Sequence, residues 1–320
     1  MEFTETLQTN DAGLLLIGAL DRYIGLTEKF AASLLDCRCP GKSQHTLLEL
    51  LRQRAYGLLG GYADGNDAAR LRNDPAFRVL LGKSLDGQDA LATQSTLSRF
   101  ENSFNAHSLL RASHALCDFV IARQRKKHKH TRRITIDINP TDDPTHGQQL
   151  FTFFNAYYDC WCYLPLLATL TFHDRHGREH PEQHLVAAML RPGNAKAYLG
   201  ATYLIRRLVR KLRKAFPGAA LRFRMDGVFL GRTSCTSFLA NQFRVLLSAA
   251  AYILAQEFRS LCSATAAARW QVNTLRERLF KFGAVVTAST RRWVLRLARF
   301  APDAALLSTL GRRLAAWPPT

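Results

Sequence analysis

Hydrophobic residues recur at spacings of three and four along the first third of the chain. This pattern predicts helices over residues 13–30, 46–59, 67–81 and 93–120. Breaks rich in glycine or containing proline separate them, at residues 39–41, 60–61 and 82–87. We therefore predict an N-terminal helical region over residues 1–122.

The pattern changes at residue 134. Residues 134–138 alternate β-branched and polar side chains and predict a strand that ends at Asn139-Pro140, and aromatic residues predict two further strands over 151–158 and 163–172. Residues 194–216 carry an apolar stripe opposite a basic face, which is typical of an exposed helix, and residues 221–225 predict a fourth strand. The prediction is an α/β core, in the order strand-strand-strand-helix-strand, over residues 134–227.

Helical spacing returns from residue 238. It predicts helices over residues 238–258, 269–282 and 291–300. Residues 227–320 hold 13 Lys+Arg against 3 Asp+Glu, so we expect a basic C-terminal helical region over residues 228–320 that suits phosphate contacts.

Charge is distributed unevenly along the 320 residues, whose formal net charge is +19. Residues 1–120 hold 12 Lys+Arg against 14 Asp+Glu, and residues 121–320 hold 32 against 11. A basic field over the last two thirds attracts a polyanion, and we favour nucleic acid over the alternative of an anionic membrane surface.

A basic run without any acid occupies residues 123–133. Such a run is often a solvated face, but a strand follows it directly, so we predict a basic linker that also touches a polyanion. The candidate nucleic-acid contacts are cations of this run, cations on the basic face of the helix predicted over residues 194–216, and one cation of the C-terminal region. They are Arg123, Arg125, Lys126, Lys127, Lys129, Arg132, Arg133, Arg206, Arg207, Arg210, Lys211 and Arg232.

The seven cysteines are scattered and odd in number. Two Cys-x-Cys pairs, at 37–39 and 160–162, are too tight for the usual zinc knuckle, so we predict no zinc site and a reducing compartment. The uncharged run over residues 245–256 is too short for a membrane span. We expect a soluble cytoplasmic protein with no membrane partner.

Two aspartates lie at the ends of the first and fourth strands of the predicted core. Asp137 lies near the end of the first strand and Asp226 directly follows the fourth. If these strands are neighbours, both carboxylates meet at one edge of the sheet and can hold a divalent metal. The alternative is two unrelated surface aspartates in turns.

Specific sequence blocks in a fixed order resemble a known family. The blocks include HTLLELLRQR (45–54), GYADGND (61–67), TLSRFEN (96–102), DINPTDDPTHGQQ (137–149), FNAYYD (154–159), LRPGN (190–194), RMDG (224–227) and GRTSCTSF (231–238). Together they resemble the bacterial insertion-sequence transposases of the DDE group 1 class, of the IS-thirteen-eighty type. The resemblance extends over nearly the whole chain.

The resemblance implies a ribonuclease H-like core in which three carboxylates hold two Mg²⁺ ions for attack on DNA phosphodiesters. Asp137 would be the first acid and Asp226 the second. Two departures stand out. Asn139 occupies a position where the family usually has aspartate. Either position 137 or position 139 could supply the metal ligand. The segment that carries the family's third acid, a glutamate, is missing between Asp226 and residue 231.

A truncated core with two acids implies weak or absent Mg²⁺ binding. Glu257 could substitute for the third acid, but an ordinary helix-end glutamate is the better interpretation of its position. The sequence therefore predicts a transposase-derived protein that binds double-stranded DNA, at the terminal inverted repeats of an insertion sequence, with impaired cleavage. The alternatives are a non-enzymatic regulator that pairs with intact transposase or with itself, and a fragment that folds poorly.

Overall fold

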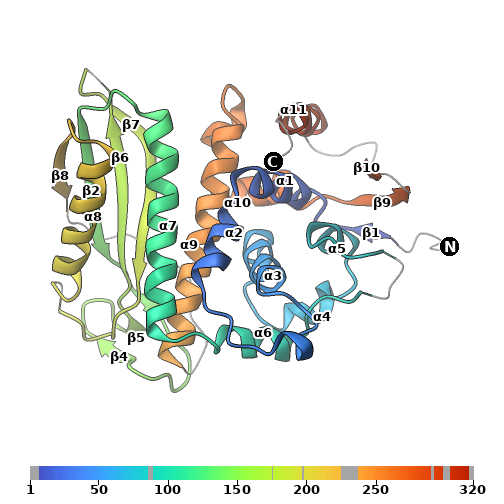
Figure 1. Cartoon of the computed structure of the whole chain (residues 1–320), viewed down its shortest axis with the longest axis horizontal. Coiled ribbons are helices and arrows are strands. Elements are labelled where there is room, and N and C mark those ends of the chain that lie inside the picture. Colours follow the sequence, from blue (N-terminus) through green and yellow to red (C-terminus); the bar gives the residue numbers. More distant parts are fainter. Residues whose placement is uncertain are drawn as a thin grey trace. The chain divides into compact units, whose positions relative to one another are not determined.

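The chain forms two compact units, drawn in Figure 1. The computed structural model describes residues 7–85, 89–174, 176–196, 198–224, 237–289, 292–297 and 303–316. We call residues 1–28, 36–100 and 254–320 the helical unit, and residues 29–35 and 101–253 the sheet unit. Helices and sheets occur in both, which confirms a mixed α/β class.

The helical unit contains most of the described helices and a small sheet in the order β1-β9-β10. Its elements are β1 (Gln8–Thr9), α1 (Leu14–Ile24), α2 (Leu26–Ser33), α3 (Leu47–Gly60), α4 (Asp67–Leu71), α5 (Pro75–Leu80), α6 (Gln94–Glu101), α10 (Val272–Leu275), β9 (Ala284–Ser289), β10 (Arg292–Leu297) and α11 (Ala304–Ala315). Short 3-10 helices lie at Pro40–Lys42 and Ala266–Arg269, and a π-helical turn at Arg276–Phe280. Residues 29–33 of α2 and Glu101 of α6 belong to the sheet unit.

The sequence marks the starts of two of these helices. Thr46 and Glu49 form a capping box before α3: the Glu49 backbone N–H donates to Thr46 Oγ1 at 3.1 Å, and the Thr46 N–H donates to Glu49 Oε2 at 2.7 Å. Asp74 caps α5 by accepting from the Phe77 N–H at 3.0 Å, and Pro75 stands at the first helical position. These caps satisfy backbone donors that the helices cannot pair themselves.

The sheet unit is built around a four-stranded sheet in the order β7-β6-β2-β8. Its elements are α7 (Ala106–Lys127), β2 (Arg133–Pro140), β3 (Asp143–Pro144), β4 (Phe153–Asn155), β5 (Cys160–Tyr163), β6 (Leu166–His173), β7 (Glu179–Met189), α8 (Ala201–Ala215), β8 (Ala220–Arg224) and most of α9 (Phe238–Leu261). β6 runs antiparallel to both β7 and β2, whereas β8 runs parallel to β2. The first and fourth strands of the predicted core, β2 and β8, are therefore neighbours in this sheet.

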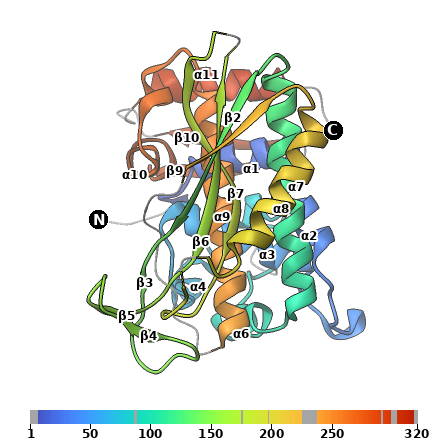
Figure 2. The ribbon, with the colours of Figure 1, turned by 90° about the vertical axis from the view of Figure 1, so that its left-hand side faces the viewer.

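The two faces of this sheet differ in polarity. Ile134, Ile136 and Ile138 of β2 are buried on one face, and Thr135, Asp137 and Asn139 alternate with them on the other. The helices α7 and α8, which lie side by side in Figure 2, cover the apolar face. Rings that follow each helix contact Phe172 of β6: His128 stacks on it at 4.5 Å and Phe216 lies 5.4 Å away, centroid to centroid.

The strand predicted over residues 151–158 is wrong. Only Phe153–Asn155 is extended there, and it belongs to a separate small sheet, β3-β5-β4. The strand of the main sheet that was not predicted is β7. Its first half is charged and polar, so its sequence lacks the alternation of a half-buried strand. The prediction that the first strand ends at Asn139-Pro140 is confirmed, because Pro140 is the last residue of β2, where it pairs with Leu166.

Two further predictions differ from the structure. The helix predicted over residues 291–300 is wrong, because Arg292–Leu297 is strand β10, in which Arg292, Val294 and Arg296 alternate with larger apolar residues. The predicted linker over residues 123–133 is helical as far as Lys127, which ends α7, and β2 begins at Arg133. The helix predicted over 194–216 is confirmed from Ala201 to Ala215.

The helix α9 passes a length-and-composition test for a membrane span within the part of the chain that the structure describes. Its most apolar window is 67% buried inside the protein. Core helices of water-soluble proteins pass the same test, and Phe243, Leu247 and Leu254 are fully buried in α9.

Candidate nucleic-acid interface and acid site

Asp137 lies on the polar face of β2 and is held by an arginine of the neighbouring strand. The parallel pairing aligns Asp137 with Arg224 of β8. Arg224 Nε donates to Asp137 Oδ1 at 2.6 Å, and Nη2 donates to Oδ2 at 3.2 Å. This is the two-pronged geometry in which guanidinium and carboxylate groups bind most strongly. Arg224 therefore engages both carboxylate oxygens.

Two more side chains complete this cluster. Thr171 of β6 donates its hydroxyl to Asp137 Oδ2 at 3.4 Å, and Arg224 Nη2 also donates to Glu179 Oε1 at 3.2 Å. The hydrogen bonds from Arg224 to Asp137 and the charges of both carboxylates raise the pKa of the guanidinium. The cluster links β7, β6, β2 and β8, so it joins all four strands of the sheet.

The described residues around Asp137 do not make a magnesium site. Both oxygens of Asp137 face a cation, and Asn139, on the same face, adds only a neutral amide. Across the described ranges, no group of three or more His, Cys, Asp or Glu side chains could hold a metal ion. Asp226 lies outside the described residues, and Glu257 is buried in α9 within the helical unit.

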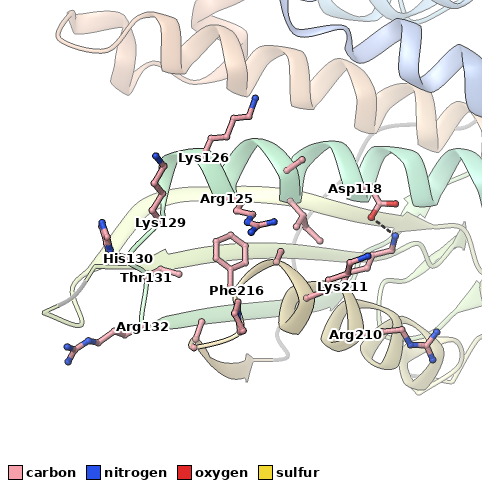
Figure 3. Close-up of a pocket in the computed structure, with 17 residues that line it drawn as sticks. Asp118, Arg125, Lys126, Lys129, His130, Thr131, Arg132, Arg210, Lys211 and Phe216 are labelled. Carbon is pink, nitrogen blue, oxygen red and sulfur yellow. Dashed lines mark hydrogen bonds and ion pairs between the residues drawn. The ribbon is translucent and has the colours of Figure 1, made fainter.

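A basic groove lies where α7 and α8 end, as Figure 3 shows. Its volume is about 1440 Å³, and it reaches the amino ends of β2 and β8 at Arg132 and Ala219. Seven cationic side chains line it: Arg125, Lys126, Lys129, Arg132, Arg210, Lys211 and Lys214. Asp118 is the one acid among its lining residues, and it pairs with Lys211.

The groove brings together six of the predicted nucleic-acid contacts: Arg125, Lys126, Lys129, Arg132, Arg210 and Lys211. Arg123, Lys127, Arg133 and Arg206 do not line it. Arg207 points inward instead: it is 8% exposed and its guanidinium donates to Ser113 Oγ at 3.2 and 3.3 Å. Arg232 lies outside the described residues.

Two basic residues of the groove, Lys214 and His130, were not among the predicted contacts. Lys214 follows Arg210 by four positions, so both share one face of α8, and that spacing could have identified it. His130 could have been found only as part of the basic run, because its place at the groove depends on the turn between α7 and β2.

Comparison with known proteins gives one family. A family model described as "Transposase DDE domain group 1" matches residues 2–231 and, in a second segment, residues 227–319. No curated protein and no solved structure matches the chain. Because the two matched segments together cover nearly all of the sequence, the chain belongs to the group 1 family of DDE-domain transposases.

Proposed function

We propose that this chain is a transposase-family protein that binds double-stranded DNA but cleaves it poorly or not at all. The observation that carries the proposal is the state of Asp137, the first predicted metal ligand: its two oxygens are occupied by Arg224. A carboxylate already neutralised by a guanidinium is a poor ligand for Mg²⁺, which needs several free oxygen donors in octahedral geometry.

The order of the sheet supports a ribonuclease H-like core of reduced size. β2, β6 and β7 form an antiparallel meander, α8 follows, and β8 returns parallel to β2. This is the strand-strand-strand-helix-strand order predicted from the sequence for the truncated core. Among the described strands, β8 pairs only with β2.

The family match supports an internal deletion after Asp226. The two matched segments meet at residues 227–231, where the sequence passes directly from the second acid to the GRTS block. A chain that had lost the family's intervening segment would give such a divided match. With that segment the third acid is lost, and two Mg²⁺ ions lack the carboxylates they require.

Two assays on the full-length protein test the proposal. In a gel-shift assay with a duplex carrying the terminal repeats that flank the gene, we expect binding. In a parallel nicking assay with Mg²⁺ or Mn²⁺, we expect no product above that of the Asp137→Asn variant. Efficient metal-dependent nicking would refute the impairment, and failure to bind the duplex would refute DNA binding.

The outer edge of β8 favours a second candidate function, regulation of an intact transposase. A strand paired on one side presents free backbone groups to which another chain can add a strand. If the protein regulates in this way, it co-elutes with a full-length transposase of the same family and lowers its activity. Unchanged activity without co-elution would exclude this candidate.

A further inference from the structure

The charge of the basic groove exceeds what the fold itself requires. Cations at the end of a helix compensate the partial negative charge of the helix dipole, about half an elementary charge for each helix. Both α7 and α8 end at the groove, and Asp118 adds one acid, so about two of the seven positive charges are compensated locally. A surplus of about five positive charges remains.

The arrangement of these cations suits an extended polyanion. In Figure 3, Arg125 lies over the groove near Phe216, while Lys126, Lys129, Arg132 and Arg210 extend outward around it. The side chains do not converge on a single point, as they would to hold one small anion. The groove, at about 1440 Å³, is also larger than the sites of about 300–1000 Å³ that take small molecules.

We propose that this groove binds the sugar-phosphate backbone of DNA, at the end of the sheet remote from Asp137, and that it does so without reading sequence. This inference rests on the proposed function, because it identifies the surface that holds the DNA. The lysine side chains act as point charges and the arginines can in addition fork onto a phosphate. Such contacts supply affinity and salt dependence rather than base specificity.

The test measures the affinity of the full-length protein for a fluorescein-labelled duplex of mixed sequence over a range of salt concentrations. The groove variant is Lys129→Gln/Arg132→Gln/Lys214→Gln, which takes one cation from the turn after α7, one from the residue before β2 and one from α8. The matched control is Lys42→Gln/Arg70→Gln/Arg72→Gln, which removes the same charge from exposed positions in the nearly neutral first third.

We expect the groove variant to bind at least about tenfold more weakly at 0.1 M salt, and the slope of log K against log salt to fall by about 2 to 3. The control variant should change neither the affinity nor the slope. The charge-preserving variant Lys129→Arg/Arg132→Lys/Lys214→Arg should keep both at their wild-type values. Urea midpoints that match the wild type confirm that each variant is folded.

The outcomes separate the inference from the proposed function. If the wild-type protein binds no DNA, the proposed function fails. If the wild type binds DNA and the groove variant keeps its affinity and slope, the groove inference alone fails. It fails likewise if the control variant loses as much affinity as the groove variant. The groove inference is also overturned if the groove variant loses binding to phosphatidylserine vesicles but keeps its affinity for DNA. The groove would then be a membrane-binding surface.

Discussion

Removing Arg224 should leave the Asp137 carboxylate without its cationic partner, with only the hydrogen bond from Thr171. Breaking a buried ion pair from one side costs about 3–5 kcal/mol. The Asp137 side chain is 9% exposed but that of Arg224 is 38% exposed, so solvent screens the pair and lowers the expected cost. We expect Arg224→Met to reduce the free energy of unfolding by about 2 kcal/mol.

The partner variant should cost less. Asp137→Asn leaves Arg224 with Glu179 and solvent, so we expect a loss of about 1 kcal/mol. If the two groups stabilise the sheet mainly through each other, the double variant loses less than the sum, with a coupling of about 1–2 kcal/mol. Arg222→Met is the matched control, because Arg222 lies on the same strand, is exposed and aligns with Thr135 instead of an acid.

Urea unfolding followed by far-UV circular dichroism measures these free energies at neutral pH. Because the chain has two units, the transition of the sheet unit is the one to analyse. Additive losses, within about 0.5 kcal/mol, would show that the ion pair contributes nothing beyond its parts. An Arg222→Met loss as large as that of Arg224→Met would refute the reasoning as well.

Three further predictions concern groups outside this pair. Burial and the charges of Lys127, His128 and His180 lower the pKa of His184 to about 3, so the folded state resists its protonation. Stability in urea titrations should fall as the pH drops below 6.5, by about 2 kcal/mol at pH 5, and His184→Phe should lose less; equal losses in the two proteins would contradict this. Burial raises the pKa of Cys117 to about 11, so iodoacetamide at pH 8 should label the exposed Cys37 first, and mass spectrometry showing equal rates would contradict this. A Cβ on Gly193 would lie 2.1 Å from a backbone carbonyl of β5, so Gly193→Ala should cost about 1–3 kcal/mol in thermal unfolding, whereas Gly218→Ala, with open space around it, should be neutral.

Alternation of polar and apolar residues along the chain predicted two strands of the main sheet. Residues 134–138 and 221–225 alternate in polarity and became β2 and β8, and the caps before α3 and α5 are visible as residues. The first half of β7 is polar and its residues are exposed or half-buried, so its sequence lacks the apolar alternation that predicts a strand. Long-range pairing, not composition, makes it part of the sheet.

The candidate site shows the same division. The cations of the basic run and of α8 were identified, but the direction of each side chain depends on helix packing, which turned Arg207 toward Ser113 and Lys214 toward the groove. The Arg224 ion pair depends on the register between two strands that are 87 residues apart in the chain. A register of that kind has no signature in the sequence of either strand.

DNA binding at the groove and chemistry at Asp137 are physically separable in this fold. Arg132 and Asp137 are five residues apart on or beside one strand, which is about 16 Å at the rise of a β-strand. The Debye length in physiological salt is about 8 Å, so solvent ions screen part of the interaction between the exposed groove cations and the acid. The pairing of Asp137 with Arg224, and the proposed loss of the third acid, therefore leave the positive charge of the groove unchanged. Under the proposed function, the chain would therefore keep the means to occupy DNA while lacking the means to cut it, which is the property that an inhibitor of an intact transposase needs.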